Sequence, residues 1–213
     1  MQKDLVAGLP FNEEGNVLLE GNIKHESFRI TPIGGKHEEG ETPEEALARE
    51  FWEEYRLRVE ETEKIDLYPT RSKGEGDFEV VTFECAIVDG SSAEWEGDRP
   101  VPRETEKASH ADWFSREELN WLNAAGLLAP NLKLLLETLQ DNYRKFFLGN
   151  ICAEIDPTLT LLDLLQWFRT KMEARITLHK QGKLQLDTFL LANETPTIAA
   201  RTFNLARALQ RDV

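Results

Sequence analysis

The stretch GGKHEEGETPEEALAREFWEEYRL, residues 34–57, constrains the fold more than any other part of the chain. Two glycines open it, and a strong helix start follows. Thr42 can cap the helix, Pro43 suits the first helical position and Glu45 completes a capping box. The apolar residues that recur at helical spacing after this start are Ala46, Leu47 and Phe51. The sequence therefore predicts a glycine-containing turn and then a helix that ends near Tyr55.

Carboxylates crowd this helix and the turn before it. Residues 34–57 contain eight Glu and three basic residues. Glu50, Glu53 and Glu54 fall at i, i+3 and i+4, so they share one face of the helix. Like charges at i and i+4 cost an isolated helix about 0.2–0.5 kcal/mol, and inside the helix only Arg49 offsets them. Such a face is either solvated or binds a divalent cation, because hard cations take several oxygen ligands.

The turn before the helix suits the close approach of a ligand. Gly34 and Gly35 free the backbone for tight geometry. Glu41 lies immediately before the expected N-cap, from which its side chain can reach back towards Arg49 or a metal. Magnesium in particular suits a few carboxylates combined with the oxygens of a substrate phosphate.

The surrounding sequence alternates apolar runs with breakers. Strands are expected in residues 3–11, 17–20, 27–32, 58–71, 77–89 and 110–115, with the near-continuous apolar run 77–89 in the centre of a sheet. Residues 91–109 are polar, contain prolines and are expected to form a loop. A second helix is expected after Ser115, with Glu118 completing its capping box. These elements predict a mixed α/β domain that ends near residue 128.

At this point the spacing of the charged and glycine positions resembles the Nudix box, and the resemblance covers residues 1 to about 128. The matching positions are Gly35, Glu41, Arg49, Glu50, Glu53, Glu54 and Leu57. The resemblance implies a Nudix α/β/α sandwich with a mixed sheet. It also implies a hydrolase that uses Mg²⁺ or Mn²⁺ to cleave a nucleoside diphosphate linked to another group, X, such as ADP-ribose or an NDP-sugar.

Roles for individual residues follow from the same resemblance. It implies that Glu50 and Glu54 are direct metal ligands and that Glu53 is a ligand or lies beside the metal. The carbonyl of Gly34 is expected to touch the metal, and Arg49 to orient the glutamates. Water held by the metal or activated by a glutamate then attacks phosphorus.

One position departs from the pattern, because Arg56 stands where the family usually has glycine. That glycine closes the helix in a left-handed conformation, which costs a non-glycine residue on the order of 1 kcal/mol. The end of the helix is therefore expected to differ here. The ligands precede it, so the metal site is expected to survive.

Further candidates lie outside the box. A late WF strand resembles the region in which many Nudix enzymes carry another catalytic glutamate, which makes Glu104 and Glu106 candidates. Candidate phosphate-binding residues, besides Gly35 in the turn, are Arg29, Lys36 and Arg71. Each of these side chains has the simpler alternative of being solvated. The family's substrate-specific markers are absent after the box, so the sequence does not identify X.

Charge and composition limit the classes of binding partner and the cellular location expected for the chain. Residues 1–140 carry 15 Lys and Arg against 31 Asp and Glu, whereas residues 141–213 carry 10 against 8, which gives −16 and +2. A surface this acidic repels nucleic acid and anionic membranes. The chain lacks a signal-peptide core and an apolar run of the roughly 18 residues that span a membrane. Cys85 and Cys152 are expected to be buried free thiols in a cytoplasmic protein.

Residues 129–213 are expected to form a helical C-terminal extension. Its apolar stripe at helical spacing is Leu161, Leu164, Leu165, Phe168, Met172 and Ile176. This stripe indicates core packing or a homodimer interface. One alternative is a ligand-sensing transcriptional regulator whose last helix contacts DNA. The arginines of that helix are Arg201, Arg207 and Arg211, but the weak positive charge of this region argues against DNA binding. A second alternative is a non-catalytic interaction protein that keeps the box as scaffold.

Overall fold

A computed structural model of the chain describes residues 3–24, 27–65, 78–103, 110–150 and 152–180. Within these residues the chain forms two compact units, of which the first ends at Leu134 and the second begins at Leu135. No helix in the described ranges is both long and apolar enough to cross a membrane.

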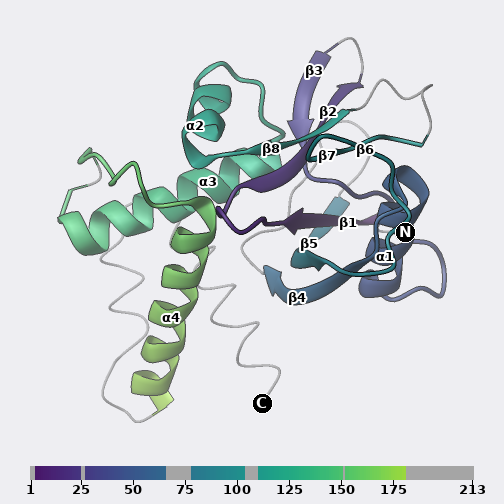
Figure 1. Cartoon of the computed structure of the whole chain (residues 1–213). Helices are drawn as coiled ribbons and strands as arrows, with labels where there is room; N and C mark the ends of the chain where they lie inside the picture. Colours follow the sequence, from purple (N-terminus) through teal and green to yellow (C-terminus); the bar gives the residue numbers. More distant parts are fainter. Residues whose placement is uncertain (1–2, 25–26, 66–77, 104–109, 151, 181–213) are drawn as a thin grey trace. The chain divides into compact units, whose positions relative to one another are not determined.

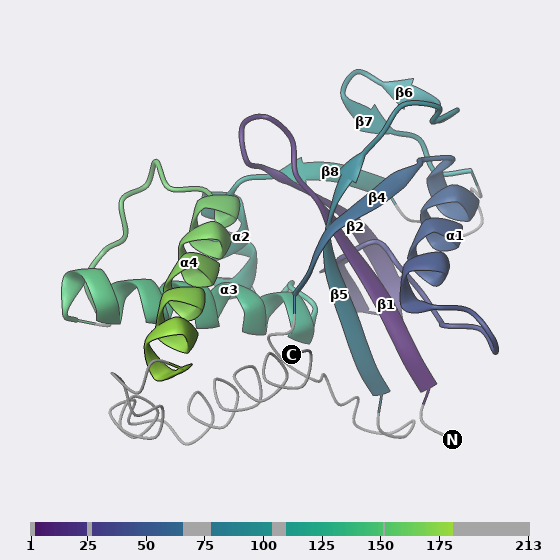
Figure 2. The same ribbon diagram turned by 90° about the horizontal axis from the view of Figure 1, so that it is seen from below.

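The first unit contains two three-stranded sheets (Figure 1). In one sheet β5 (Phe78–Ile87) lies between β1 (Lys3–Pro10), to which it is parallel, and β4 (Val59–Ile65), to which it is antiparallel. Figure 2 shows β1 and β5 side by side. The other sheet is antiparallel, with β2 (Val17–Lys24) between β3 (Ser27–Thr31) and β8 (His110–Phe114). The predicted α/β class with a mixed sheet is confirmed, and so is the central position of β5.

The predicted carboxylate helix is α1 (Pro43–Tyr55). Thr42 caps it, and both hydrogen bonds of the capping box with Glu45 are present. The helix packs through one face into the core of the first unit. The side chains that it buries are Ala46, Leu47, Phe51 and Tyr55. Gly8 of β1 makes this packing possible, because a Cβ there would lie 2.5 Å from a ring carbon of Phe51.

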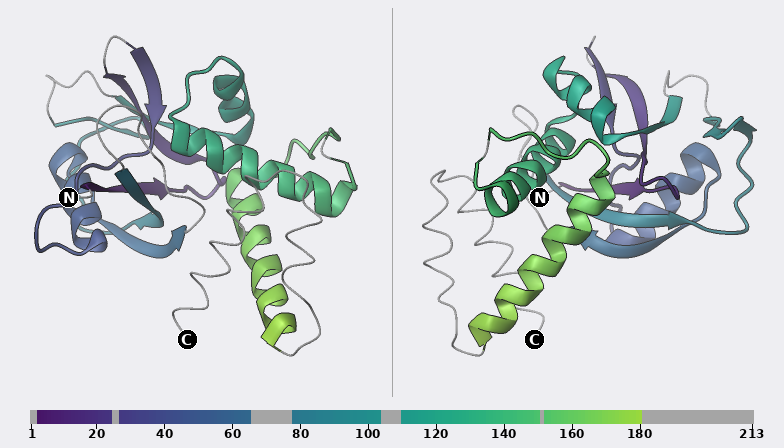
Figure 3. Two further views of the ribbon diagram at one scale, coloured as in Figure 1. Left: turned by 180° about the vertical axis from the view of Figure 1, so that it is seen from behind. Right: turned by 60° about the vertical axis from the view of Figure 1, so that its left-hand side comes forward.

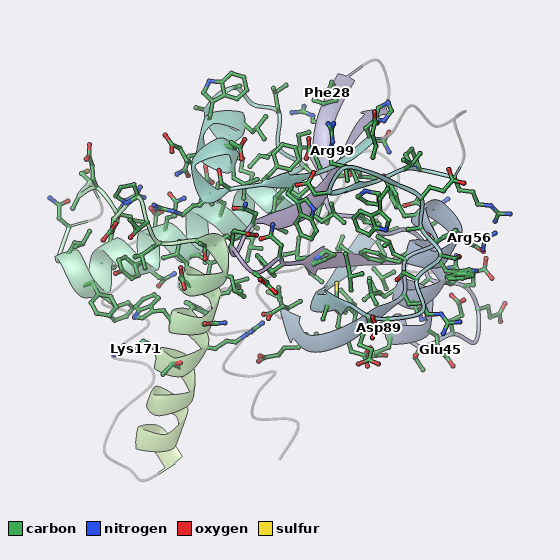
Figure 4. The ribbon with its side chains drawn as sticks, in the orientation of Figure 1. Phe28, Glu45, Arg56, Asp89, Arg99 and Lys171 are labelled. Atoms are coloured by element: carbon green, nitrogen blue, oxygen red, sulfur yellow. The ribbon has the colours of Figure 1, made fainter. Side chains whose placement is uncertain are left out.

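Arg56 ends α1 in the left-handed conformation, with φ 57° and ψ 25°. The expectation that the helix end would differ from that of a glycine-terminated helix is therefore wrong. The guanidinium lies 5.0 Å from the ring centre of Trp52, and that of Arg58 lies 5.5 Å from the same ring. The Arg56 N–H donates to the carbonyl of Trp52, and the Arg56 carbonyl accepts from Ser92. These contacts offset the strain of the backbone. Figure 4 places Arg56 at the opposite end of α1 from Glu45.

The strain at Arg56 can be measured by comparing two substitutions. Arg56→Gly and Arg56→Ala both remove the stacking on Trp52, but only glycine removes the cost of the left-handed backbone. We expect Arg56→Gly to be more stable than Arg56→Ala by about 1 kcal/mol in denaturant unfolding. Equal stabilities would show that Arg56 carries no backbone strain.

The segment 91–109 differs from the predicted loop. Within it β6 (Trp95–Glu96) pairs with β7 (Arg99–Pro100) as a short hairpin. The indole N–H of Trp113 donates to the carbonyl of Asp98, and Arg99 pairs with Asp112 at 3.5 Å, so both contacts tie the hairpin to β8. Two-residue strands are too short to leave an alternating pattern in the sequence. The helix that follows is α2 (Arg116–Ala124), and its predicted capping box is present.

The described part of the second unit is mainly helical, as expected for the C-terminal extension. Its helices are α3 (Pro130–Tyr143), which begins in the first unit, a π-helical turn η1 (Arg144–Leu148) and α4 (Leu161–Lys180), shown in Figure 3. The apolar stripe of α4 is buried within the chain from Leu161 to Phe168. Aromatic rings of α3 and η1 pack on Trp167 of α4. Cys152 is exposed, so its predicted burial is wrong, whereas Cys85 is buried. The residues of the proposed DNA-binding helix, Arg201, Arg207 and Arg211, lie outside the described part.

Candidate active site

The two glycines of the turn lie against β1. The N–H of Gly8 donates to the carbonyl of Ile33 at 2.8 Å, and the N–H of Val6 donates to the carbonyl of Gly35 at 2.9 Å. Gly34 has φ +154°, and a Cβ there would lie 2.2 Å from the Val6 carbonyl oxygen. Both the conformation and the space require glycine at this position.

Gly35 makes room for a carboxylate. A Cβ on Gly35 would lie 2.4 Å from the carboxyl carbon of Glu50. The Glu50 carboxylate therefore lies directly against the glycine backbone, and its side chain is only 13% exposed. This contact joins the turn to α1 at the position where the sequence predicts a metal ligand.

Arg49 gathers three of the predicted site residues. Its Nε donates to Glu41 at 2.8 Å, and its Nη1 donates to Glu50 at 2.9 Å and to Glu53 at 3.2 Å. Its Nη2 donates to a second oxygen of Glu41 at 3.1 Å and to the carbonyl of Lys36 at 2.8 Å. The bidentate grip on Glu41 and the bond to Lys36 fix the turn to the helix. Glu53 is the most accessible of the three carboxylates, at 57% exposed.

These contacts shift two pKa values in opposite directions. The hydrogen bond from Arg49, together with the N–H of Glu38, holds the pKa of Glu41 below its ordinary value of 4.5. The Glu41 and Glu50 carboxylates raise the pKa of Arg49 further above its ordinary value. Both shifts favour the ionised forms, so Glu41 and Arg49 form an ion pair at neutral pH.

Removing Arg49 should reverse the shift of Glu41. In Arg49→Ala we expect the pKa of Glu41 to rise towards or above the ordinary value, because its main hydrogen-bond donor is lost and its acidic neighbours remain. Carboxyl chemical shifts in an NMR pH titration measure this directly. Because the folded pKa is lowered in the wild type, the stabilisation by the pair is present above the unfolded pKa and is lost as pH falls through the folded pKa. An unchanged pKa in the variant would contradict this assignment.

The segment that follows the β6–β7 hairpin forms a backbone hydrogen bond with Glu54. The N–H of Arg103 donates to the carbonyl of Glu54 at 2.8 Å. The residue that precedes Glu104 is therefore attached to the helix that carries the predicted metal ligands. Glu104 and Glu106 themselves lie outside the described residues, as does Arg71.

The predicted phosphate-binding residues differ in their surroundings. The Arg29 guanidinium donates to the carbonyl of Gly126, so it links β3 to the segment after α2. Lys36 has an exposed side chain, and its carbonyl is held by Arg49. The contacts of Arg29 and those of Arg49 share no residue within the described ranges.

One buried acidic residue is not among the candidates predicted from the sequence. Glu20 on β2 is 4% exposed and accepts a hydrogen bond from the phenol of Tyr55, the last residue of α1. A signal was present, since Glu20 interrupts the apolar run VLLEG in a strand. Charged residues are rarely fully buried unless they are partnered, so an acidic residue in such a run indicates a specific contact.

The residues of this region are suited to a divalent cation by their chemistry. Every predicted ligand offers an oxygen, namely the carboxylates of Glu50, Glu53 and Glu54 and the carbonyl of Gly34, as Mg²⁺ and Mn²⁺ prefer. The space at Gly35 already admits a carboxylate against the backbone. Among the described residues, no group of three or more His, Cys, Asp or Glu side chains is arranged to hold a metal ion.

Comparisons with known proteins identify the family of the chain. A family model described as the NUDIX domain matches residues 1–137. A MutT-like protein of Streptomyces ambofaciens is 28% identical over 115 residues, which are 54% of this chain; the match spans 65% of that protein's length. A NUDIX hydrolase structure from Nitrosomonas europaea is 20% identical, with a TM-score of 0.49 over 62% of this chain and 84% of that chain. An ADP-ribose pyrophosphatase structure from Streptococcus suis is 17% identical, with a TM-score of 0.40 over 55% of this chain and 76% of that chain. Because the family model matches more than half of its residues, the chain belongs to the NUDIX domain family.

Proposed function

We propose that the protein is a Nudix pyrophosphohydrolase that uses Mg²⁺ or Mn²⁺ to cleave a nucleoside diphosphate linked to another moiety, X. The observation that carries this proposal is the carboxylate cluster around Arg49, which lies beside two glycines that admit close backbone contact. A merely solvated acidic helix does not require Gly35 to accommodate the Glu50 carboxylate. The membership in the family supports hydrolysis, and the finer assignments below are part of the proposal.

In this proposal Glu50, Glu53, Glu54 and the Gly34 carbonyl hold the metal. A divalent cation, when bound, neutralises the diphosphate and activates water for attack on phosphorus. Glu53 is the most exposed carboxylate of the Arg49 cluster, which suits a residue that exchanges protons with the attacking water. Glu104 and Glu106 are the alternative candidates for this proton transfer, because Arg103 is bonded to the Glu54 carbonyl.

Arg49 has a positioning role. Its guanidinium holds Glu41 by two hydrogen bonds and Glu50 by one, so it can release Glu50 and Glu53 to a metal while it keeps Glu41 and the Lys36 carbonyl. Gly35, Arg29, Lys36 and Arg71 are proposed to bind the substrate, in which the phosphates require positive charge or backbone donors. A homodimer, with no binding of DNA, completes the proposal.

The test is hydrolysis of a substrate panel with and without added metal. The panel contains ADP-ribose, NDP-sugars, NADH, dinucleoside polyphosphates and nucleoside triphosphates, each with Mg²⁺, Mn²⁺ or EDTA. We expect metal-dependent release of a nucleoside monophosphate from at least one compound that contains a diphosphate, and the preferred compound identifies X. Folded protein that cleaves nothing in the panel would overturn the proposal for these substrates.

A further inference from the structure

Glu20 makes hydrogen bonds to two other elements of the first unit. Its Oε2 accepts from the phenol of Tyr55 at 3.1 Å, and its Oε1 accepts from the hydroxyl of Thr31 on β3 at 3.2 Å. The side chain of Asn22 adds a longer contact to Oε1 at 3.4 Å. Glu20 is 4% exposed and Tyr55 is 1% exposed, so water cannot readily replace these donors. The carboxylate therefore depends on them for its hydrogen bonding.

The electrostatics of Glu20 make the contact specific. Its three hydrogen-bond partners, Thr31, Tyr55 and Asn22, are all neutral donors. A buried carboxyl group that depends on neutral donors tolerates little movement of those donors, because each lost hydrogen bond leaves a buried polar oxygen unsatisfied. The hydroxyls of Thr31 and Tyr55 both lie within hydrogen-bond distance of the Glu20 carboxylate.

The positions of these two partners in the chain point to a role. Thr31 lies three residues before Gly34, and Tyr55 directly follows Glu54. One carboxylate therefore bonds to the residues on both sides of the segment that contains the glycine turn and all of the proposed metal ligands. We propose that Glu20 is a positioning residue. Its hydrogen bonds to Thr31 and Tyr55, here called the Glu20 clasp, hold the two ends of this segment together and so fix the Gly34 backbone relative to the glutamates of α1.

This inference rests on the proposed function for its consequence, although the clasp itself does not. A helix end that is free to shift changes the direction of the Glu53 and Glu54 side chains relative to the turn. Metal ligands need oriented support, and loss of such support typically lowers metal affinity or activity about 10- to 100-fold. We therefore expect Glu20→Gln and Tyr55→Phe each to weaken Mn²⁺ binding by about 10-fold or more.

The variants are chosen to separate positioning from stability. Glu20→Gln replaces one acceptor oxygen by an N–H₂ group that cannot accept, Tyr55→Phe removes only the phenolic hydroxyl, and Thr31→Val replaces the hydroxyl by a methyl group. Val17→Ala is the matched control, since Val17 is buried on the same strand but points to the opposite face. We expect this control to lower the melting temperature without changing Mn²⁺ affinity. The double variant Glu20→Gln/Tyr55→Phe should be no weaker in Mn²⁺ affinity than the weaker single variant.

Hydrogen exchange gives a readout that does not depend on metal or substrate. Glu20→Gln should raise amide exchange at both ends of the clasped segment, in residues 28–36 and 50–57, whereas Val17→Ala should not. The proposal is overturned if Glu20→Gln and Tyr55→Phe lose stability like Val17→Ala but keep wild-type Mn²⁺ affinity and wild-type amide exchange in residues 28–36 and 50–57. If the wild type itself binds no Mn²⁺, the proposed function fails, and the exchange data still decide whether the clasp exists.

Discussion

Glu50→Gln and Glu54→Gln should each lower turnover of the preferred substrate by at least roughly 100-fold, because each removes a charged oxygen ligand at the metal. Glutamine keeps the size of the side chain, so the buried surroundings of the Glu50 carboxylate against Gly35 remain filled. The stability of Glu54→Gln should stay close to that of the wild type or rise, since removing one negative charge relieves the repulsion between Glu50 and Glu54. Glu50→Gln also weakens the ion pair with Arg49, so it should be modestly less stable than the wild type. Steady-state kinetics at several metal concentrations, together with thermal unfolding, measure both effects.

Glu39→Gln is the matched control for this pair. Glu39 is an exposed carboxylate of the same glycine turn, and its replacement changes the net charge by the same amount. It should retain wild-type turnover. If all three variants lose activity equally, the loss comes from overall charge and not from the proposed ligands. If Glu50→Gln and Glu54→Gln stay active, the assignment of these ligands is wrong.

Alanine at the two adjacent glycines should affect different properties, namely fold stability at Gly34 and metal affinity at Gly35. At Gly34 a Cβ meets the Val6 backbone at 2.2 Å and the backbone is in a glycine conformation, so we expect Gly34→Ala to destabilise the fold by at least about 2 kcal/mol. At Gly35 the Cβ meets the flexible end of Glu50 at 2.4 Å. There the carboxylate moves instead of the backbone, and stability should fall by no more than about 1 kcal/mol.

The loss in Gly35→Ala should appear in metal affinity and turnover. Displacing Glu50 from the turn removes a ligand from its place, so we expect Mn²⁺ affinity to fall at least about 10-fold in a variant that is still folded. Denaturant unfolding and Mn²⁺ titration of both variants test the contrast. A Gly35→Ala protein with wild-type metal affinity would show that the contact between Gly35 and Glu50 is incidental.

The helix α1 shows how much of the fold is encoded locally. Its N-cap, its capping box and its buried stripe depend on residues within a few positions of each other, and each matches its prediction. The same holds for the capping box of α2. Strands were predictable where they are long and apolar, as for β5, because burial on both faces leaves a continuous hydrophobic run.

The features that sequence did not reveal depend on distant contacts. Arg56 keeps a left-handed backbone because Trp52 and Ser92 hold it, and Ser92 belongs to a loop far along the chain. The β6–β7 hairpin is tied to β8 through Trp113 and Arg99, which no local pattern signals. A propensity argument based on one residue therefore gave the wrong expectation at Arg56.

The site divides in the same way. The spacing of Glu50, Glu53 and Glu54 on one helical face follows from the sequence, because it depends on helix geometry alone. The grip of Arg49 on Glu41, the space at Gly35 and the contact between Glu20 and Tyr55 depend on side-chain conformations and on the pairing of the turn with β1. These contacts determine whether the carboxylates can bind the same cation.

The most direct measurement is Mn²⁺ binding to the wild type followed by electron paramagnetic resonance of the free ion. The comparison is Glu50→Gln/Glu54→Gln against Glu38→Gln/Glu39→Gln, a double variant of equal charge in the turn. We expect saturable binding in the wild type and in the turn variant, and its loss in the helix variant. Equal binding in all three proteins, or none in any, would contradict a metal site on this helix.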